Sequence, residues 1–414
     1  MPEPVKTPAK TDSKVSSTLR DLISSLGPGI ITAALVFGPG SLTITSRLGA
    51  LYGYQLLWVL VISTFFMIVF TGMAARIGMV TNQSLLSTIK IKWGKAASVL
   101  TGLGVFLVTA SFQAGNSIGA GLAFAELFQT STTIWIIVFT LGGISLLFFK
   151  SFYKVLEKVM FYLVGLMLIS FITTLIIVKP SFLNILQGLI PEIPEGSILL
   201  VIALVASSFS VVGAFYQSYL VQEKGWKESD VTKGRRESYT GIIILGLISS
   251  MILISAATIL QPQGIAVNAA TDMGKALEPL FGTWATTVFM LGLFGASFSS
   301  LIGNATIGGS MLADSFSLGS NLRDKSVRLM IMLVMAIGAT VAILFGRLPL
   351  ELIVFAQGVT IFIVPFIGWA IFSIANDEKI MGNRRIKGWV KITGALGLII
   401  LIILAVNNIR IFIF

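Results

Sequence analysis

The stretch GPGIITAALVFGPGSLTITS, residues 27–46, is an apolar segment with a break in its middle. The break consists of Gly38, Pro39, Gly40 and Ser41. Proline removes a backbone hydrogen-bond donor and the glycines permit non-helical dihedral angles, so a helix that enters this stretch is expected to stop and restart. An ordinary proline kink is the simpler alternative.

A second apolar segment is interrupted by the run SSFSVVG, residues 207–213. A small-residue packing face is the alternative explanation for this run. Each interrupted segment opens a group of five apolar segments, and paired broken helices in corresponding positions are typical of transporters built from inverted repeats. We therefore predict a first repeat at residues 21–190, a second at 191–380 and one more helix within 381–414.

Composition places the chain in a membrane. Of its 414 residues 55% are hydrophobic and only 11% are charged, and the mean hydropathy is +0.93. Cysteine and histidine are absent, which excludes disulfides, thiolate metal ligands and imidazole. The net charge of +11 is spread over short loops and does not form the clustered patch that nucleic acid requires. No nucleotide-binding or catalytic motif is present, so an enzyme is not expected.

Eleven segments are long and apolar enough to span a bilayer, which takes roughly 17 to 25 residues each. The predicted spans are 22–46, 48–75, 96–125, 127–149, 159–178, 196–222, 238–271, 279–313, 329–346, 352–376 and 392–409. The expected fold class is thus an all-α membrane protein with 11 transmembrane helices, of which helices 1 and 6 are broken.

The distribution of Lys and Arg predicts the orientation of these spans in a cell (inner) membrane. With the N-terminus inside, 24 of the 29 Lys and Arg residues lie in cytoplasmic segments and 5 lie outside, Arg47 among the latter. The C-terminus is then extracellular or periplasmic. Residues 1–20 are polar and rich in Pro, Ser, Thr and Lys, and we expect them to form a disordered cytoplasmic tail.

Several motifs resemble those of the NRAMP metal transporters. Gly27-Pro28-Gly29 and, eight residues later, Gly38-Pro39-Gly40-Ser41 reproduce the spacing of that family's first helix, whose second motif is Asp-Pro-Gly-Asn. Similar matches are found at residues 52–59, 75–78, 220–222, 291–300 and 381–391. The resemblance covers nearly the whole chain, and it implies the LeuT-like 5+5 inverted repeat of that family.

The departures from the family pattern fall on its metal ligands. Gly38 stands where the family has its aspartate, Ser41 where it has asparagine, and Ser210 where it has methionine. In the third segment Asn116 replaces an acidic residue of the family's proton route, and Gln217 takes a histidine position in the sixth. The resemblance therefore points to an NRAMP-related branch that does not carry transition metals.

A small oxyanion, bicarbonate by preference, fits the remaining groups best. A half-helix that begins at a break offers free backbone amides and a partial positive charge, and hydroxyls donate further hydrogen bonds. Hydroxyls that merely cap freed backbone groups are the alternative. The predicted substrate-binding residues are Gly38, Pro39, Gly40, Ser41, Thr43, Ser208, Ser210 and Gly213.

Sodium is the expected coupling ion, because it needs only neutral oxygens and the central stretches carry no group that would hold a proton. The predicted coupling-ion residues are Gln113, Asn116, Ser300, Asn304 and Gln357. For Gln113 and Asn116, hydrogen bonding between helices is an equally good explanation.

Two other functions remain open. One is transport of a divalent cation such as magnesium that keeps its water shell, and the other is a membrane sensor that no longer transports. Apart from the solute ion, possible Na⁺ and the lipid bilayer, we expect no cofactor and no obligate protein partner.

Overall fold

Every regular element in the described part of the chain is helical, in a computed structural model that describes residues 37–413 except 82, 149 and 323. The predicted tail at 1–20 and the first half of the first predicted span, up to residue 36, lie outside the described residues. The all-α prediction is therefore confirmed for the described residues.

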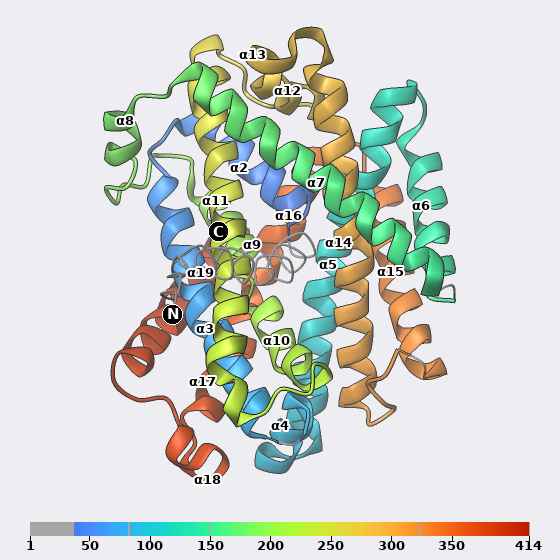
Figure 1. The fold of residues 1–414 in the computed structure, drawn as a ribbon, viewed down its shortest axis with the longest axis vertical. Coiled ribbons are helices and arrows are strands. Elements are labelled where there is room, and N and C mark those ends of the chain that lie inside the picture. Colours follow the sequence, from blue (N-terminus) through green and yellow to red (C-terminus); the bar gives the residue numbers. More distant parts are fainter. Residues whose placement is uncertain (1–36, 82, 149, 323, 414) are drawn as a thin grey trace, which may run out of the picture.

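The longest helices extend along the molecule, and several short ones lie at its two ends (Figure 1). The helices of ten or more residues are α2 (Pro39–Tyr52), α3 (Leu57–Val80), α5 (Lys95–Phe128), α6 (Thr132–Leu146), α7 (Lys150–Val178), α9 (Ile198–Phe209), α10 (Val211–Glu223), α11 (Val231–Ile259), α14 (Ala285–Ser315), α15 (Lys325–Phe345), α16 (Pro349–Gly358), α17 (Val364–Ala375) and α19 (Gly388–Ile413).

The short elements include α4 and α18 at one end and α12 and α13 at the other (Figure 1). The short α-helices are α4 (Leu85–Trp93), α8 (Phe182–Gln187), α12 (Ala270–Gly274), α13 (Glu278–Phe281) and α18 (Glu378–Met381). The 3₁₀ turns are η1 (Glu228–Asp230), η2 (Gln261–Gln263), η3 (Lys275–Leu277), η4 (Gly282–Trp284), η5 (Val359–Phe362) and η6 (Gly382–Arg384).

Seven helical stretches of the described chain are long and apolar enough to cross a membrane, and a bent pair, α16 with α17, makes an eighth. The helices α6 and the apolar part of α7 are shorter. The predicted count of eleven, which includes the segment before residue 37, stays a prediction.

The boundary predicted between the first two spans was wrong. The first helix does not end at residue 46 but continues to Tyr52, and the chain turns at Gly53 with φ of 60°, a conformation that glycine adopts without strain. Arg47, predicted in an outer loop, lies on α2, where its guanidinium is 3.7 Å from the carboxylate of Glu351 on α16. The charged Arg47 interrupts the apolar sequence, and for that reason the helix was predicted to end before it.

The sixth predicted span is broken as expected, at Ser210. This residue has φ of 41° and ψ of 55°, the left-handed region, and it separates α9 from α10. The tenth span, predicted as continuous over 352–376, is also broken, because α16 and α17 meet at 45° around the η5 turn. Asn408 of α19 donates a hydrogen bond to the Gly358 carbonyl beside this second break (3.3 Å).

Small residues allow α5 and α14 to pack closely along their length. A Cβ at Gly308 of α14 would overlap the side chain of Thr109, and one at Gly102 of α5 would overlap Ser315. The glycines therefore let the two helices pack in direct contact, and the pair forms one wall beside the site.

The helices α3 and α10 are joined at the end of the molecule that bears α4. A Cβ at Gly78 would overlap the Ser218 carbonyl, so the two backbones touch. The Gln222 amide nitrogen then donates to the carbonyl oxygens of Gly78 (3.1 Å), Thr81 (3.1 Å) and Gln83 (2.6 Å).

Candidate functional site

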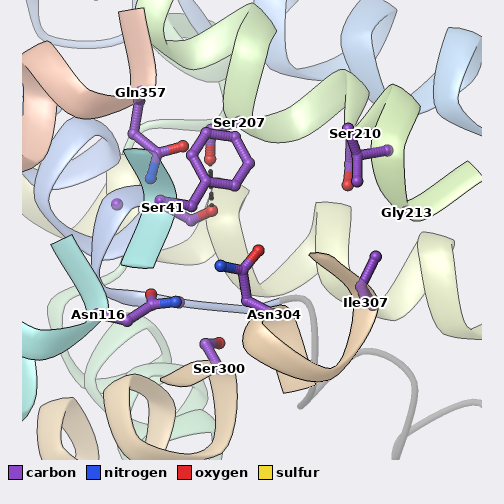
Figure 2. Close-up of a pocket in the computed structure, with 13 residues that line it drawn as sticks. Ser41, Asn116, Ser207, Ser210, Gly213, Ser300, Asn304, Ile307 and Gln357 are labelled. Carbon is purple, nitrogen blue, oxygen red and sulfur yellow. Dashed lines mark hydrogen bonds between the residues drawn. The ribbon is translucent and has the colours of Figure 1, made fainter. Parts of the chain in front are cut away.

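A cavity of about 60 Å³ lies where the helix breaks meet the wall of α5 and α14 (Figure 2). Its lining comes from α2, from both sides of the α9–α10 break, from α5, α14 and α16. The lining residues are Gly38, Gly40, Ser41, Phe112, Asn116, Ser207, Ser210, Val212, Gly213, Ser300, Asn304, Ile307 and Gln357.

The N-terminus of α2 opens on this cavity. Gly38 is its N-cap with extended backbone and no side-chain cap, and the first intrahelical bond is donated by Leu42 to the Gly38 carbonyl (3.3 Å). Pro39 has no N–H, so the amides of Gly40 and Ser41 are left without an acceptor within the helix. Both residues line the cavity, and they bring the partial positive charge of the helix end to it.

The N-terminus of α10 opens on the same cavity. Ser210 is its N-cap and makes no side-chain cap, and Ala214 donates the first intrahelical bond to the Ser210 carbonyl (2.9 Å). The amides of Val211, Val212 and Gly213 therefore have no acceptor within the helix. Val212 and Gly213 line the cavity.

Two hydrogen bonds hold the start of α2 in place. The hydroxyls of Ser41 and Ser207 lie 2.9 Å apart and join the start of α2 to the last turn of α9 (Figure 2). The Ser300 hydroxyl of α14 donates to the Phe37 carbonyl just before α2 (3.1 Å).

The opposite wall carries a network of three side-chain amides. Asn304 of α14 donates from its Nδ2 to the Thr109 carbonyl (2.6 Å) and to Gln113 Oε1 (3.1 Å). Gln113 donates from its Nε2 to the Leu301 carbonyl (2.8 Å), and its Oε1 accepts a longer bond from Asn116 Nδ2 (3.4 Å). The network ties α5 to α14 beside the cavity.

The lining that the described residues form contains no carboxylate, imidazole or thiolate. Its polar groups are backbone amides, hydroxyls and side-chain amides, all neutral. Within the described residues no three His, Cys, Asp or Glu side chains come together in a way that would hold a metal ion. A metal ion here would be bound by neutral oxygens and nitrogens alone.

Most of the predicted site residues line the cavity, and four do not. Pro39 forms the first turn of α2, Thr43 and Ser208 are buried outside the lining, and Gln113 is buried behind Asn304. Sequence reasoning missed four lining residues: Phe112, Ser207, Val212 and Ile307. Ser207 belongs to the same serine run that drew attention to Ser208, whereas Phe112 and Ile307 are apolar and carry no sequence signal.

The profile of the Nramp family, described as natural resistance-associated macrophage protein-like, matches residues 29–410. Among curated relatives, the divalent metal cation transporter MntH of Chromohalobacter salexigens is 26% identical and covers 92% of this chain and 89% of its own. The MntH of Bacillus subtilis is 24% identical and covers 96% and 93%. Both names refer to divalent metal cations, so they lend no support to bicarbonate or to sodium.

Solved structures share the fold. A mutant of the manganese transporter of Eremococcus coleocola superposes with a TM-score of 0.75 at 18% identity and covers 98% of this chain and 88% of its own. MHP1, a nucleobase-cation-symport-1 family transporter, superposes with a TM-score of 0.64 at 12% identity and covers 93% and 92%. These two transporters have different solutes, so the fold alone does not fix the solute. The profile match over nearly the whole chain decides the family: this chain belongs to the Nramp family and is a multi-pass membrane transporter.

Proposed function

We propose that this transporter carries a small oxyanion, with bicarbonate as the first solute to test. The observation that carries the proposal is the convergence of two uncapped helix N-termini, those of α2 and α10, on a cavity whose described lining contains no carboxylate. Free amides at helix N-termini bind anions, and the partial charge of each helix end favours a negative solute.

The absence of a carboxylate at position 38 strongly weakens the binding of a cation. A unit positive charge about 4 Å from a carboxylate gains roughly 4 kcal/mol at an effective dielectric constant near 20, and a divalent ion gains more. Gly38 stands where the Nramp motif has its aspartate, and nothing else in the cavity restores that charge. The same absence removes the repulsion that an anion would meet.

The neutral lining of the cavity bears on the second candidate, a divalent cation, which the names of the relatives favour. Magnesium is usually bound through one or two carboxylates together with waters that it keeps. The described lining offers only neutral oxygens and nitrogens, which compensate a divalent charge poorly.

Sodium remains the coupling ion that we propose to test. No titratable side chain lines the cavity, so proton coupling has no carrier there. Sodium could take the orphan carbonyls at the C-terminal end of α9 and the side-chain oxygen of Gln357, which Figure 2 shows on the side of Ser207.

The test is uptake into proteoliposomes that contain the purified full chain. Radiolabelled bicarbonate, Mn²⁺ and Mg²⁺ are compared, each with and without an inward sodium gradient. We expect saturable bicarbonate uptake that the sodium gradient increases, and no uptake of either metal above protein-free vesicles. Saturable metal uptake without bicarbonate uptake would establish the second candidate instead.

A further inference from the structure

The amide network fixes which atoms of Asn116 and Asn304 face the cavity. Gln113 Nε2 lies 2.8 Å from the Leu301 carbonyl, which can only accept, so the nitrogen of this amide is assigned. Gln113 Oε1 must then accept, and it lies 3.1 Å from Asn304 Nδ2 and 3.4 Å from Asn116 Nδ2. The anchor at the Leu301 carbonyl thus sets the orientation of all three amides.

On this side of the cavity the amide network therefore leaves side-chain oxygens, which accept hydrogen bonds. Both N–H groups of Asn304 are engaged, by the Thr109 carbonyl and by Gln113, so its remaining polar atom is the oxygen. Figure 2 shows that oxygen turned toward the space below Ser41 and Ser207. Asn116 is only 4% exposed, and its Oδ1 lies 3.3 Å from the place of a Cβ on Gly38. Neither oxygen has a hydrogen-bond donor among the described residues.

The other side of the cavity is rich in donors. Gly40, Ser41, Val212 and Gly213 line the cavity, and their amides have no acceptor within their helices. Ser210 is 8% exposed, and its hydroxyl has no hydrogen-bond partner among the described residues. A solute that matches both walls has oxygens that accept at one end and a hydroxyl that donates at the other. An unprotonated oxyanion such as nitrate would set its own oxygen against the amide oxygens.

We propose that the solute is a protonated oxyanion of the hydrogencarbonate type, whose hydroxyl donates to Asn304 Oδ1 or Asn116 Oδ1. This inference rests on the proposed oxyanion function and adds to it the basis of selectivity. Sites that hydrogen-bond a hydroxyl reject analogues that lack it, because a buried acceptor is then left unpaired. The amide network therefore acts as a selectivity filter against nitrate.

The experiment measures how nitrate competes with radiolabelled bicarbonate for uptake into proteoliposomes at constant pH. Nitrate is also planar and singly charged but has no hydroxyl. The wild type should need at least about 100-fold more nitrate than unlabelled bicarbonate for half inhibition. In Asn304→Leu the apparent bicarbonate affinity should fall about 10-fold or more, while the nitrate concentration for half inhibition changes little, so the ratio narrows.

The matched control is Ser111→Ala, which removes a hydroxyl of α5 that donates to the Ala356 carbonyl (2.7 Å) and does not line the cavity. It should leave the ratio of the two ions as in the wild type. Where Asn304→Leu is not monodisperse, Asn116→Leu tests the same ratio. Equal competition by nitrate and bicarbonate in the wild type would overturn this inference and leave the oxyanion function standing. Uptake of neither ion would remove the oxyanion function itself.

Discussion

The Tyr219 hydroxyl donates a hydrogen bond to Asp314 Oδ2 over 2.7 Å. Tyr219 lies on α10 and Asp314 near the end of α14, and the same hydroxyl accepts a longer bond from the Leu86 amide at the start of α4 (3.4 Å). One side chain therefore ties a half-helix of the site to the α5–α14 wall, at the end of the molecule that α4 occupies.

Tyr219→Phe should loosen that end. A hydrogen bond to a charged group contributes about 1.5–3 kcal/mol, and no other hydrogen bond of the Asp314 side chain is found among the described residues. We expect a cysteine at Ile307, in this cysteine-free chain, to react faster with a thiol reagent applied from the side of α4. The exposed Tyr162 supplies the control, because Tyr162→Phe makes the same change far from this contact. An unchanged labelling rate would mean that Tyr219 does not hold this end closed.

Gly38→Asp should abolish bicarbonate transport in a folded protein. Aspartate is a good N-cap, so its carboxylate would bind the free amides of α2 in place of the solute, and it would repel an anion by roughly 4 kcal/mol at about 4 Å. The new Cβ lies 3.2 Å from Ser300 Oγ, a tight fit that needs a shift of a few tenths of an ångström. Uptake kinetics and thermal unfolding measure the two effects.

The control for this change is Gly38→Asn, which adds a similar volume and a similar cap without the charge. It should keep part of the bicarbonate uptake. Normal transport by a folded Gly38→Asp protein would show that the solute does not bind at the start of α2, and the oxyanion proposal would fail with it.

Ser210→Gly and Ser210→Ala should separate backbone strain from solute binding. Ser210 is held at φ of 41°, which costs a residue with a Cβ about 1 kcal/mol and costs glycine little. The glycine variant should therefore unfold at a higher temperature than the alanine variant. Both lose the hydroxyl, so both should bind bicarbonate about 5-fold more weakly, equivalent to about 1 kcal/mol. Unequal affinities of the two variants would assign the effect to the backbone.

The orientation of the chain can be tested with single cysteines at opposite ends. Ser229 in η1 is exposed and belongs to a predicted cytoplasmic loop, and Gln263 in η2 is exposed and lies near the predicted outer end of the seventh span, 238–271. An impermeant thiol reagent added to intact cells should label Gln263→Cys and leave Ser229→Cys unlabelled, because Lys and Arg concentrate on the inside. The reverse pattern would invert the topology.

The two breaks differ in how far the sequence reveals them. The serine run around Ser210 lies in an apolar stretch, and hydroxyls with a glycine signal an interruption locally. The break after α16 carries only Gln357, Gly358 and the later Pro365 as signals within a long apolar run, and its partner Asn408 lies 50 residues away. A contact of that separation leaves no trace in local periodicity.

In the cavity, too, contacts between residues far apart in the sequence could not be predicted. The residue types at the two helix starts could be read from the sequence, because glycine, proline and serine have local conformational preferences. The role of Gln113 could not, because its partners Leu301 and Asn304 lie 188 and 191 positions away. It was predicted to bind the coupling ion, yet its Oε1 accepts two hydrogen bonds from neighbouring amides and has little capacity left for a cation.

The clamp that Gln222 makes on α3 restricts how this transporter can move. One amide nitrogen has two hydrogens and is shared by three carbonyls, so any tilt of α10 relative to α3 weakens at least one bond. With Gly78 against the Ser218 backbone, the two helices are also in direct backbone contact. During turnover they should rock together as one rigid body. The distance between spin labels on α3 and α10 should then stay constant during transport, while the distance between labels on α10 and α14 should change.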